Sequence, residues 1–502
     1  MIRKVLIANR GEIALRISCT LREMGIQTVA VFTEPDEHAL HVQSAHEARA
    51  ISSYLDASEI VRTAKESGAD AIHPGYGFLA ENADFSEACE VSGIVFIGPR
   101  ADTIRAMGDK LESKRVMQQA GIPIVPAWNG SPPRSEFPVL VKAVGGGGGK
   151  GMRLVQNAAE LQDALASASR EASAAFGDHR VFVEKYIRQP RHIEFQILGD
   201  ADGNAIHAFE RECSIQRRHQ KIIEETPSPA VTPELRVQMG SAALAAARAV
   251  NYRGAGTVEF IVDPSGKFYF LEMNTRLQVE HPITEMTTGL DLVREQVLIA
   301  SGEKLNYAQS GLCQTGHALE CRIYAEVPEE NFRPDTGVIE VFEPPSGPGV
   351  RLDTGVGRGS VVSYHFDPLL AKLIAWAPSR RAAIDRMKRA LDDFVLLGVR
   401  NNIEFLRRVI STDDFGSGKL DTTFLDRHGE VFNVPNEVPV EALLVASTRG
   451  PVGEAQARQR EASRGEAQAR QHEASRNDSA DQPGGHSSPL QDVWDSGNWR
   501  NS

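Results

Sequence analysis

Five consecutive glycines at positions 145–149, between Lys142 and Lys150, constrain this chain more than any other segment. They follow the apolar run at residues 139–141, which predicts a short strand that ends at Lys142. Each glycine held in an ordered loop loses about 0.5 to 1 kcal/mol more backbone entropy than alanine, so a folded loop needs a compensating interaction. Backbone N–H groups without a Cβ nearby can approach an anion closely, and the lysines add positive charge. The segment therefore predicts a polyphosphate site under a mobile, glycine-rich flap.

A flexible linker is the alternative interpretation of such a glycine run. Linkers rarely begin at the end of a strand, and this block contains no serine. A P-loop is excluded, because Met152 stands where the motif G-x-x-x-x-G-K-[ST] requires serine or threonine after the lysine.

Length and composition indicate a multidomain globular protein. With 502 residues the chain is long enough for about three domains. No apolar stretch approaches the roughly 18 residues of a membrane-spanning helix, and the chain begins with a strand-like sequence, so we expect a cytoplasmic protein with no membrane partner. Five cysteines without C-x-x-C spacing indicate reduced thiols and argue against a zinc site. The formal net charge of -12 disfavours nucleic-acid binding.

The N-terminal segment predicts a Rossmann-like α/β domain. Residues 5–8 and 28–32 have the character of strands, and residues 13–24 between them have helical periodicity. The first turn, Asn9-Arg10-Gly11-Glu12, lacks G-x-G-x-x-G. A dinucleotide site is therefore not supported.

Two strand-like segments, 257–262 and 267–272, flank the turn at 263–266 and predict a hairpin. If the turn centres between Pro264 and Ser265, Glu259 opposes Phe270 and Glu272 lies two residues further on the same face. Diagonal neighbours of this kind have Cα atoms about 7 to 8 Å apart. The two carboxylates are then placed to bind Mg²⁺ or Mn²⁺ together with nucleotide phosphates.

The same alternation continues beyond the hairpin. Asn274, Arg276, Gln278 and Glu280 alternate with mostly apolar residues, so a continuing strand would place them on one face. Such a face can bind a metal, an anion and a proton. An ordinary solvated strand face is the alternative.

Several segments together resemble the biotin carboxylase family, the ATP-grasp component of biotin-dependent carboxylases. They are residues 9–14, 73–82, 107–110, 142–152, 184–186, 190–194, 216–221, 272–282 and 320–323. The match runs in order from about residue 1 to residue 430. The resemblance implies an N-terminal domain at 1–112, an ATP-grasp domain at 113–313 with a mobile lid at about 128–190, an α+β C-terminal domain at 314–430, and a disordered low-complexity tail at 445–502.

This family is known to activate bicarbonate with ATP, through carboxyphosphate, and then to carboxylate biotin, so the resemblance implies an ATP-dependent ligase. It implies an ATP site formed by Lys110, Lys142, Gly145, Gly146, Gly147, Gly148, Gly149, Glu184, Lys185, Tyr186, Ile187, His192, Gln216, His219, Glu259 and Glu272. It implies Mg²⁺ or Mn²⁺ on Glu259, Glu272 and Asn274. Bicarbonate would contact Lys221, Arg276, Gln278, Val279 and Glu280, with Glu280 as the base. Biotin would contact Tyr76 and Arg322, and the catalytic set would be Lys221, Arg276, Glu280 and Arg322.

The resemblance also implies partners: a biotin carboxyl carrier protein, carboxyltransferase subunits and a second copy of the chain in a homodimer. We expect the first half-reaction of an acetyl-CoA or other acyl-CoA carboxylase, as in fatty acid biosynthesis. A pyruvate or other carboxylase, another ATP-grasp ligase and a subunit without turnover are the alternatives. No Met-Lys-Met occurs, and Met387-Lys388 precedes Arg389 in a helical pattern, so we expect a separate carrier and no biotin on this chain.

Two segments depart from the family pattern. Residues 128–137 are shorter than expected and lack an evident helix, which puts the start of the lid in doubt. Residues 453–464 and 465–476 repeat one sequence of 12 residues, except at Arg460 and His472. This composition cannot form a core, so we expect an inert tail rather than a docking arm. A chain that ends at Asn436 should keep its melting temperature and its rate of ATP hydrolysis.

Overall fold

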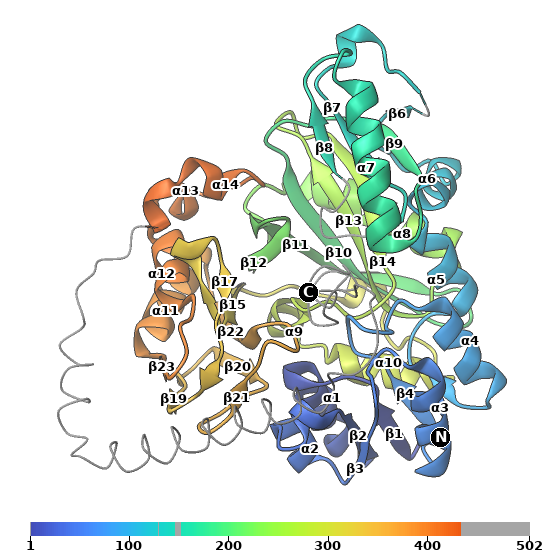
Figure 1. The fold of residues 1–502 in the computed structure, drawn as a ribbon, viewed down its shortest axis with the longest axis vertical. Coiled ribbons are helices and arrows are strands. Elements are labelled where there is room, and N and C mark those ends of the chain that lie inside the picture. Colours follow the sequence, from blue (N-terminus) through green and yellow to red (C-terminus); the bar gives the residue numbers. More distant parts are fainter. Residues whose placement is uncertain (1, 129, 146–151, 433–502) are drawn as a thin grey trace, which may run out of the picture. The chain divides into compact units, whose positions relative to one another are not determined.

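The computed structural model describes residues 2–128, 130–145 and 152–432 (Figure 1). The tail at 445–502 and the glycines at 146–149 lie outside these residues. The described part has the mixed α/β fold that we predicted, with one parallel sheet followed by antiparallel sheets. Among its helices, none is both long enough and apolar enough to cross a lipid bilayer.

The N-terminal segment forms a five-stranded parallel sheet in the order β3-β2-β1-β4-β5. Its elements are β1 (Lys4–Ile7), α1 (Gly11–Glu23), β2 (Gln27–Phe32), α2 (Leu40–Ser44), β3 (Glu47–Ala50), α3 (Ala57–Glu66), β4 (Ala71–His73), α4 (Ala83–Val91), β5 (Val95–Phe96) and α5 (Ala101–Gly108). The predicted strand, helix and strand at the start of the chain are confirmed as β1, α1 and β2. Residues of β1 and β4 are buried on both faces, as in other parallel sheets that helices cover.

A four-stranded antiparallel sheet follows α6 (Lys110–Gln119), in the order β6-β9-β7-β8. Its elements are β6 (Ala127–Trp128), β7 (Val139–Ala143), β8 (Arg153–Val155), α7 (Leu161–Phe176) and β9 (Val181–Lys185). Helix α7 lies beside this sheet (Figure 1). Its residues Leu161 and Ala168 belong to one core cluster with apolar side chains of the sheet. Between β6 and β7, the described residues 130–138 contain one turn of 3-10 helix, Arg134–Glu136, and no α-helix. Strands β6 and β7 of this sheet are therefore joined by a short connection without an α-helix in its described residues.

An eight-stranded antiparallel sheet has the order β14-β13-β10-β11-β12-β15-β22-β20. Its strands are β10 (Arg191–Gly199), β11 (Ala205–Arg217), β12 (Gln220–Thr226), β13 (Gly254–Val262), β14 (Phe268–Asn274), β15 (His317–Tyr324), β20 (Val350–Thr354) and β22 (Leu369–Ala377). The helices α8 (Pro233–Ala249), α9 (His281–Thr288) and α10 (Leu292–Ala300) lie between these strands in the sequence. Because β12 pairs with β15, the sheet continues across residue 313, where we expected a domain boundary. That boundary stays a prediction.

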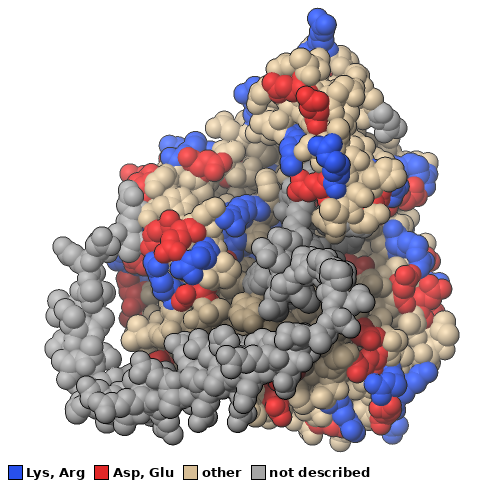
Figure 2. All heavy atoms as spheres, viewed as in Figure 1, with Lys and Arg blue, Asp and Glu red and all other residues tan. Residues whose placement is uncertain are grey.

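The remaining elements belong to the C-terminal part of the chain. They are β16 (Glu326–Val327), β17 (Arg333–Pro334), β18 (Gly337–Val338), β19 (Val341–Glu343), β21 (Val361–Val362), α11 (Arg380–Asp393), β23 (Val395–Leu397), α12 (Ile403–Ser411), α13 (Asp413–Gly416) and α14 (Phe424–Arg427). Ile384, Leu406 and Phe424 from these helices form one core cluster with Leu319 and Cys321 of β15. On the face in Figure 2, the charges of the described residues are interspersed, without a broad basic surface.

The predicted hairpin forms from β13 and β14, but its predicted register is wrong. Glu259 opposes Glu272 rather than Phe270, and Phe260 opposes Phe270. The loop closes through a bond from the N–H of Asp263 to the carbonyl of Lys267, and a bulge after Glu259 shifts the pairing by one further residue. Alternation of side chains encodes neither the loop length nor the bulge. The two carboxylates are thus directly opposed, where Cβ atoms are about 4.5 to 5.5 Å apart, closer than we predicted.

The expected continuation of β14 beyond the hairpin is also wrong. β14 ends at Asn274, and residues 275–280 contain no strand. Leu277 and Val279 are buried in a core cluster with Val5 and Ile7 of the N-terminal sheet. Burial of these side chains directs the backbone out of the large sheet and into α9.

Candidate active site

A cavity of about 370 Å³ opens beside the large sheet and the four-stranded sheet. Most of the residues predicted to bind ATP line it: Lys110, Lys142, Glu184, Lys185, Tyr186, Ile187, His192, Gln216, His219, Glu259 and Glu272. Lys221, Gln278 and Arg322 line it as well. Gly145 is described but does not line the cavity. The fold therefore gathers residues that are far apart in the sequence around one space.

Lys221 of β12 is the centre of one end of this cavity. Its ammonium group donates to Glu194 Oε2 at 2.6 Å, to Glu259 Oε1 at 2.7 Å and to Glu280 Oε1 at 2.7 Å. All four side chains are buried. Burial alone would lower the pKa of Lys221, but the three carboxylates raise it well above its usual value. Lys221 is therefore a permanent cation.

The register between neighbouring strands of the large sheet places a row of charged side chains beside Lys221. Glu272, Glu259, Glu194 and Arg211 are successive partners across β14, β13, β10 and β11. Burial, followed by the charge of Glu259, raises the pKa of Glu272. Burial would also raise the pKa of Glu259, but Lys221 and His192 lower it. Two opposed carboxylates of this kind favour a bound cation.

The oxygen donors of this row suit Mg²⁺. Asn274 Nδ2 donates to Glu259 Oε1 at 2.7 Å, so its own amide oxygen is directed away from that bond. Carboxylate and amide oxygens are the ligands that hard divalent cations prefer. A second group, His192, Glu194 and Glu259, has ligand atoms within 4.8 Å of one another. His192 Nε2 lies 2.7 Å from Glu259 Oε2.

Arg276 and Gln278 converge on the same row although the strand has ended. Arg276 donates to Gln278 Oε1 at 2.9 Å and to Asn274 Oδ1 at 3.3 Å. Gln278 Nε2 donates to Glu259 Oε1 at 3.1 Å, and Arg276 Nε donates to Glu81 Oε2 at 3.0 Å. Side-chain hydrogen bonds thus bring together the residues that we expected a strand to align.

Glu280 lies between two cations, Lys221 and Arg322. Arg322 donates through Nη2 to Glu280 Oε2 at 3.0 Å and through Nε to Glu224 Oε1 at 2.6 Å. Burial would raise the pKa of Glu280, but Lys221 and Arg322 hold it well below its usual value. Among the described residues, Nη1 of Arg322 has no hydrogen-bond partner, although it is buried. The site therefore pairs an ionised carboxylate with a buried N–H group that can donate to a ligand.

Another part of the cavity wall, the basic end around Lys142, has the reverse arrangement, one carboxylate between two lysines. Lys142 Nζ lies 2.6 Å from Glu184 Oε2, and Lys114 Nζ donates to Glu184 Oε1. Burial would raise the pKa of Glu184, but Lys142 and Lys114 lower it. Burial lowers the pKa of Lys114 despite Glu184. This end attracts an anion.

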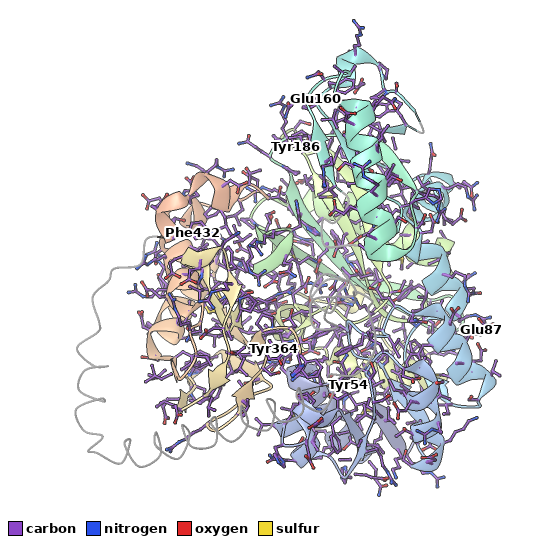
Figure 3. The ribbon with its side chains drawn as sticks, in the orientation of Figure 1. Tyr54, Glu87, Glu160, Tyr186, Tyr364 and Phe432 are labelled. Carbon is purple, nitrogen blue, oxygen red and sulfur yellow. The ribbon has the colours of Figure 1, made fainter. Side chains whose placement is uncertain are left out.

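Tyr186 and His219 complete the wall of the cavity. Tyr186, labelled in Figure 3, follows β9 where the chain passes from the four-stranded sheet to the large sheet. Gln216 Nε2 lies 2.8 Å from His192 Nδ1 and fixes that ring. Burial and the charge of Lys142 lower the pKa of His219, so its imidazole is neutral at pH 7.

Tyr76 lies in a separate cavity of about 50 Å³ rather than in the large one. Its hydroxyl donates to Glu12, and its backbone carbonyl accepts from Asn9 Nδ2 at 2.7 Å. Burial, and then Glu12, raises the pKa of Tyr76 well above its usual value. The structure thus places the two expected biotin contacts, Tyr76 and Arg322, in the walls of different cavities.

Glu194 and Lys114 are functional candidates that we did not predict from the sequence. Like His192, Glu194 alternates with the apolar residues Ile193 and Phe195 on β10. This period of two would have predicted that Glu194 lies on the same face of the strand as His192. Lys114 gave no signal, because polar residues are ordinary on a helix such as α6.

Three family profiles match this chain. Residues 1–104 match the N-terminal domain of biotin carboxylase, and residues 320–427 match its C-terminal domain. Residues 109–308 match the ATP-binding domain of the carbamoyl-phosphate synthase L chain. These matches, together with the cavity, define an ATP-grasp ligase.

Individual relatives agree with the profiles. The chloroplastic biotin carboxylase of Arabidopsis thaliana is 49% identical over 451 residues, which are 87% of this chain and 84% of that protein. The mitochondrial methylcrotonoyl-CoA carboxylase subunit alpha of Rattus norvegicus is 49% identical over 444 residues, and this chain covers only 62% of its length. The biotin carboxylase domain of Hydrogenobacter thermophilus 2-oxoglutarate carboxylase, solved as a dimer with MgADP, ADP and bicarbonate, has a TM-score of 0.84 and 47% identity, covering 87% of this chain and 100% of that domain. The chain belongs to the biotin carboxylase family.

Proposed function

We propose that this chain carboxylates biotin, with ATP and bicarbonate as the other substrates and carboxyphosphate as the intermediate. The observation that carries the proposal is the position of Glu280 between Lys221 and Arg322, two residues that line a cavity whose wall also carries Lys110 and Lys142. The related biotin carboxylase domain solved with MgADP and bicarbonate supports the same substrates.

In the proposed nucleotide site, Lys110 and Lys142 bind the phosphates of ATP. The glycines at 145–149 close over them and exclude water. Residues 184–187 frame the adenine, and His192, Gln216 and His219 lie along the nucleotide. Magnesium, when held by Glu259, Glu272 and Asn274, neutralises charge on the phosphates during phosphoryl transfer.

In the proposed bicarbonate site, Lys221, Arg276, Gln278 and Val279 hold the anion next to Glu280. Glu280, whose carboxylate Lys221 and Arg322 hold ionised, takes its proton. Phosphate that carboxyphosphate releases takes the N1′ proton of biotin, and N1′ forms the bond to the carboxyl carbon. Arg322 donates from Nη1 to the ureido oxygen of biotin and stabilises the charge that develops there. Tyr76, which lines the separate smaller cavity, is the second proposed biotin contact.

ADP release from the purified protein tests the proposal. We expect release that requires bicarbonate and increases with biotin. Release that is indifferent to biotin would favour another ATP-grasp ligase. Absence of any bicarbonate-dependent release would contradict the proposed activity.

We further propose that the biotin is attached to a separate carrier protein and that the chain acts as a homodimer. The absence of Met-Lys-Met from this sequence supports the separate carrier, and the related domain solved as a dimer supports the homodimer. In a streptavidin blot of native cell extract, we expect a smaller biotinylated protein that copurifies with this chain. A biotinylated band at the mass of this chain would contradict the proposal.

We propose an acyl-CoA as the final carboxyl acceptor: acetyl-CoA is the candidate from the family resemblance, and methylcrotonoyl-CoA is the candidate from the named relative. Copurified carboxyltransferase subunits, identified by mass spectrometry and assayed with both thioesters, distinguish them. A requirement for pyruvate would contradict the acyl-CoA assignment. The cytoplasmic location stays a prediction, since the relatives named above are a chloroplastic and a mitochondrial protein.

A further inference from the structure

The backbone next to Glu280 is held by side chains instead of a strand ladder. The carbonyl of Gln278 accepts from the N–H of His281 at 3.3 Å and lies 2.7 Å from His281 Nδ1. The carbonyl of Val279 accepts from Lys372 Nζ at 2.8 Å. A lysine from β22 therefore fixes the peptide group that joins Val279 to Glu280.

Lys372 is the only charged residue in the nine-residue strand β22 and is fully buried. A buried ammonium group is expensive unless it is paired and hydrogen-bonded. Its nearest acidic atoms are Glu12 Oε2 at 3.3 Å and Asp353 Oδ2 at 3.9 Å, and the ring of Tyr76 lies 6.0 Å away. Glu320 of β15 also acts on it electrostatically. Lys372 thus links one backbone carbonyl to acidic groups on several elements.

Register places Lys372 beside the proposed catalytic pair. Lys372 and Arg322 are direct partners across β22 and β15, so their side chains lie on the same face of the sheet. Arg322 contacts the side chain of Glu280, whereas Lys372 contacts the backbone one residue earlier. Two adjacent strands therefore present two cations to the same two-residue segment.

We propose that Lys372 is a positioning residue for bicarbonate and for the carboxylate of Glu280. The carbonyl of Val279 and the N–H of Glu280 belong to one planar peptide group, so a bond to the carbonyl fixes the direction in which Glu280 leaves the backbone. Glu12 orients the ammonium group of Lys372 and accepts from the hydroxyl of Tyr76, which connects the proposed biotin side to the proposed base. This inference rests on the proposed function.

Replacement of Lys372 by methionine tests the proposal through the two substrates separately. In Lys372→Met, we expect the KM for bicarbonate to rise and kcat to fall, each by about tenfold or more, because small misplacements of reacting groups have effects of this size. The KM for ATP should stay within about twofold, since the nucleotide end of the cavity does not contact Lys372. Lys372→Arg should recover part of the loss.

Lys4→Met is the matched control. Lys4 also bonds one carboxylate, Glu47, and one backbone carbonyl, that of Ser67, but it lies in β1. Its loss should leave both KM values and kcat unchanged. The same kinetic change in Lys4→Met would mean that any loss of a paired lysine perturbs the enzyme, and would overturn the proposal.

Loss of Lys372 also leaves the carboxylate of Glu12 without its cation, which should lower the stability of the protein. A separate variant is therefore needed to distinguish an effect on stability from an effect on kinetics. The double variant Glu12→Gln with Lys372→Met removes both charges and should recover the melting temperature that Lys372→Met loses. Its KM for bicarbonate should stay high, because the carbonyl of Val279 still lacks its donor. Recovery of kinetics together with stability would show that Lys372 only stabilises the fold.

The wild-type protein separates this inference from the proposed function. If it releases no ADP in response to bicarbonate and biotin, both fail. If it is active and Lys372→Met keeps its KM for bicarbonate and its kcat, only the positioning role fails. Should Lys372→Met not fold, Lys372→Arg decides the question, because a displaced donor should still raise the KM for bicarbonate and not that for ATP.

Discussion

The two ends of the large cavity have opposite arrangements of charge. At one end a single ammonium group, that of Lys221, contacts three carboxylates. At the other end a single carboxylate, that of Glu184, contacts the ammonium groups of Lys142 and Lys114. Like charges that are crowded in a poorly hydrated site repel strongly, and a ligand of the opposite sign relieves the repulsion. One end therefore favours a metal cation and the other a polyphosphate, which together match a metal–nucleotide substrate.

The largest expected effect concerns the acidic end, where Glu280 is the proposed base. In Glu280→Gln, the amide cannot accept a proton, so bicarbonate-dependent ADP release should fall by about 10²- to 10⁴-fold. The KM for ATP should hardly change, because Glu280 contacts Lys221 and Arg322, whereas the lysines of the basic end contact Glu184. Near-normal turnover in a steady-state assay would remove Glu280 from the mechanism.

The next effect tests whether Lys221 substitutes for a metal cation. Lys221→Met leaves three buried carboxylates without their shared cation and should lower the free energy of unfolding by about 3 to 5 kcal/mol. Urea denaturation with and without MgCl₂ measures this loss, and Mg²⁺ should recover more stability in the variant than in the wild type. If Mg²⁺ raised the free energy of unfolding equally in both proteins, the proposal that this end of the cavity binds a cation would be contradicted.

The basic end should respond to the nucleotide instead. Lys142→Met removes a charge-assisted bond to phosphate, worth about 1.5 to 3 kcal/mol, and should raise the KM for ATP by about 10- to 100-fold. Stability should change little, because Lys114 still neutralises Glu184. Lys304→Met is the control, since Lys304 also pairs with one carboxylate, Asp202, but is mostly exposed. A KM for ATP that rises equally in the control would refute the assignment.

The smallest effect is a dependence of stability on pH. The pKa of Glu184 is lower in the folded protein than in the unfolded chain, because Lys142 and Lys114 outweigh the opposing effect of burial. Its contribution to stability is therefore present above the unfolded pKa of about 4.3 and is lost as the pH falls through the folded value. Urea denaturation should find that the stability difference between wild type and Glu184→Gln shrinks below about pH 4.3. A difference that stays constant with pH would mean that the carboxylate is not held ionised by the lysines.

Local patterns in the sequence were enough to predict much of the site. The strand before the glycine run and the turn of the hairpin follow from the conformations that glycine, proline and β-branched residues favour, whereas the flap predicted from the glycines stays a prediction. Period-two alternation identified Glu259, Glu272 and Asn274, and it was also available for Glu194. Most residues that were assigned to ATP from the family resemblance line one cavity.

The pairing of buried charges was decided by the tertiary structure alone. Lys114 and Glu184 are 70 residues apart in the sequence, and Lys372 and Val279 are 93 apart. The bulge after Glu259 was not evident from the sequence. The departure of residues 275–280 from the sheet was not evident either, because it depends on how Leu277 and Val279 pack against the N-terminal sheet. The amino-acid sequence by itself determined where strands and turns form and which side chains they carry, because these local structures depend on residues that are neighbours along the chain. Which groups meet across the cavity depended on contacts between distant segments, and only the packing of the sheets sets their distances.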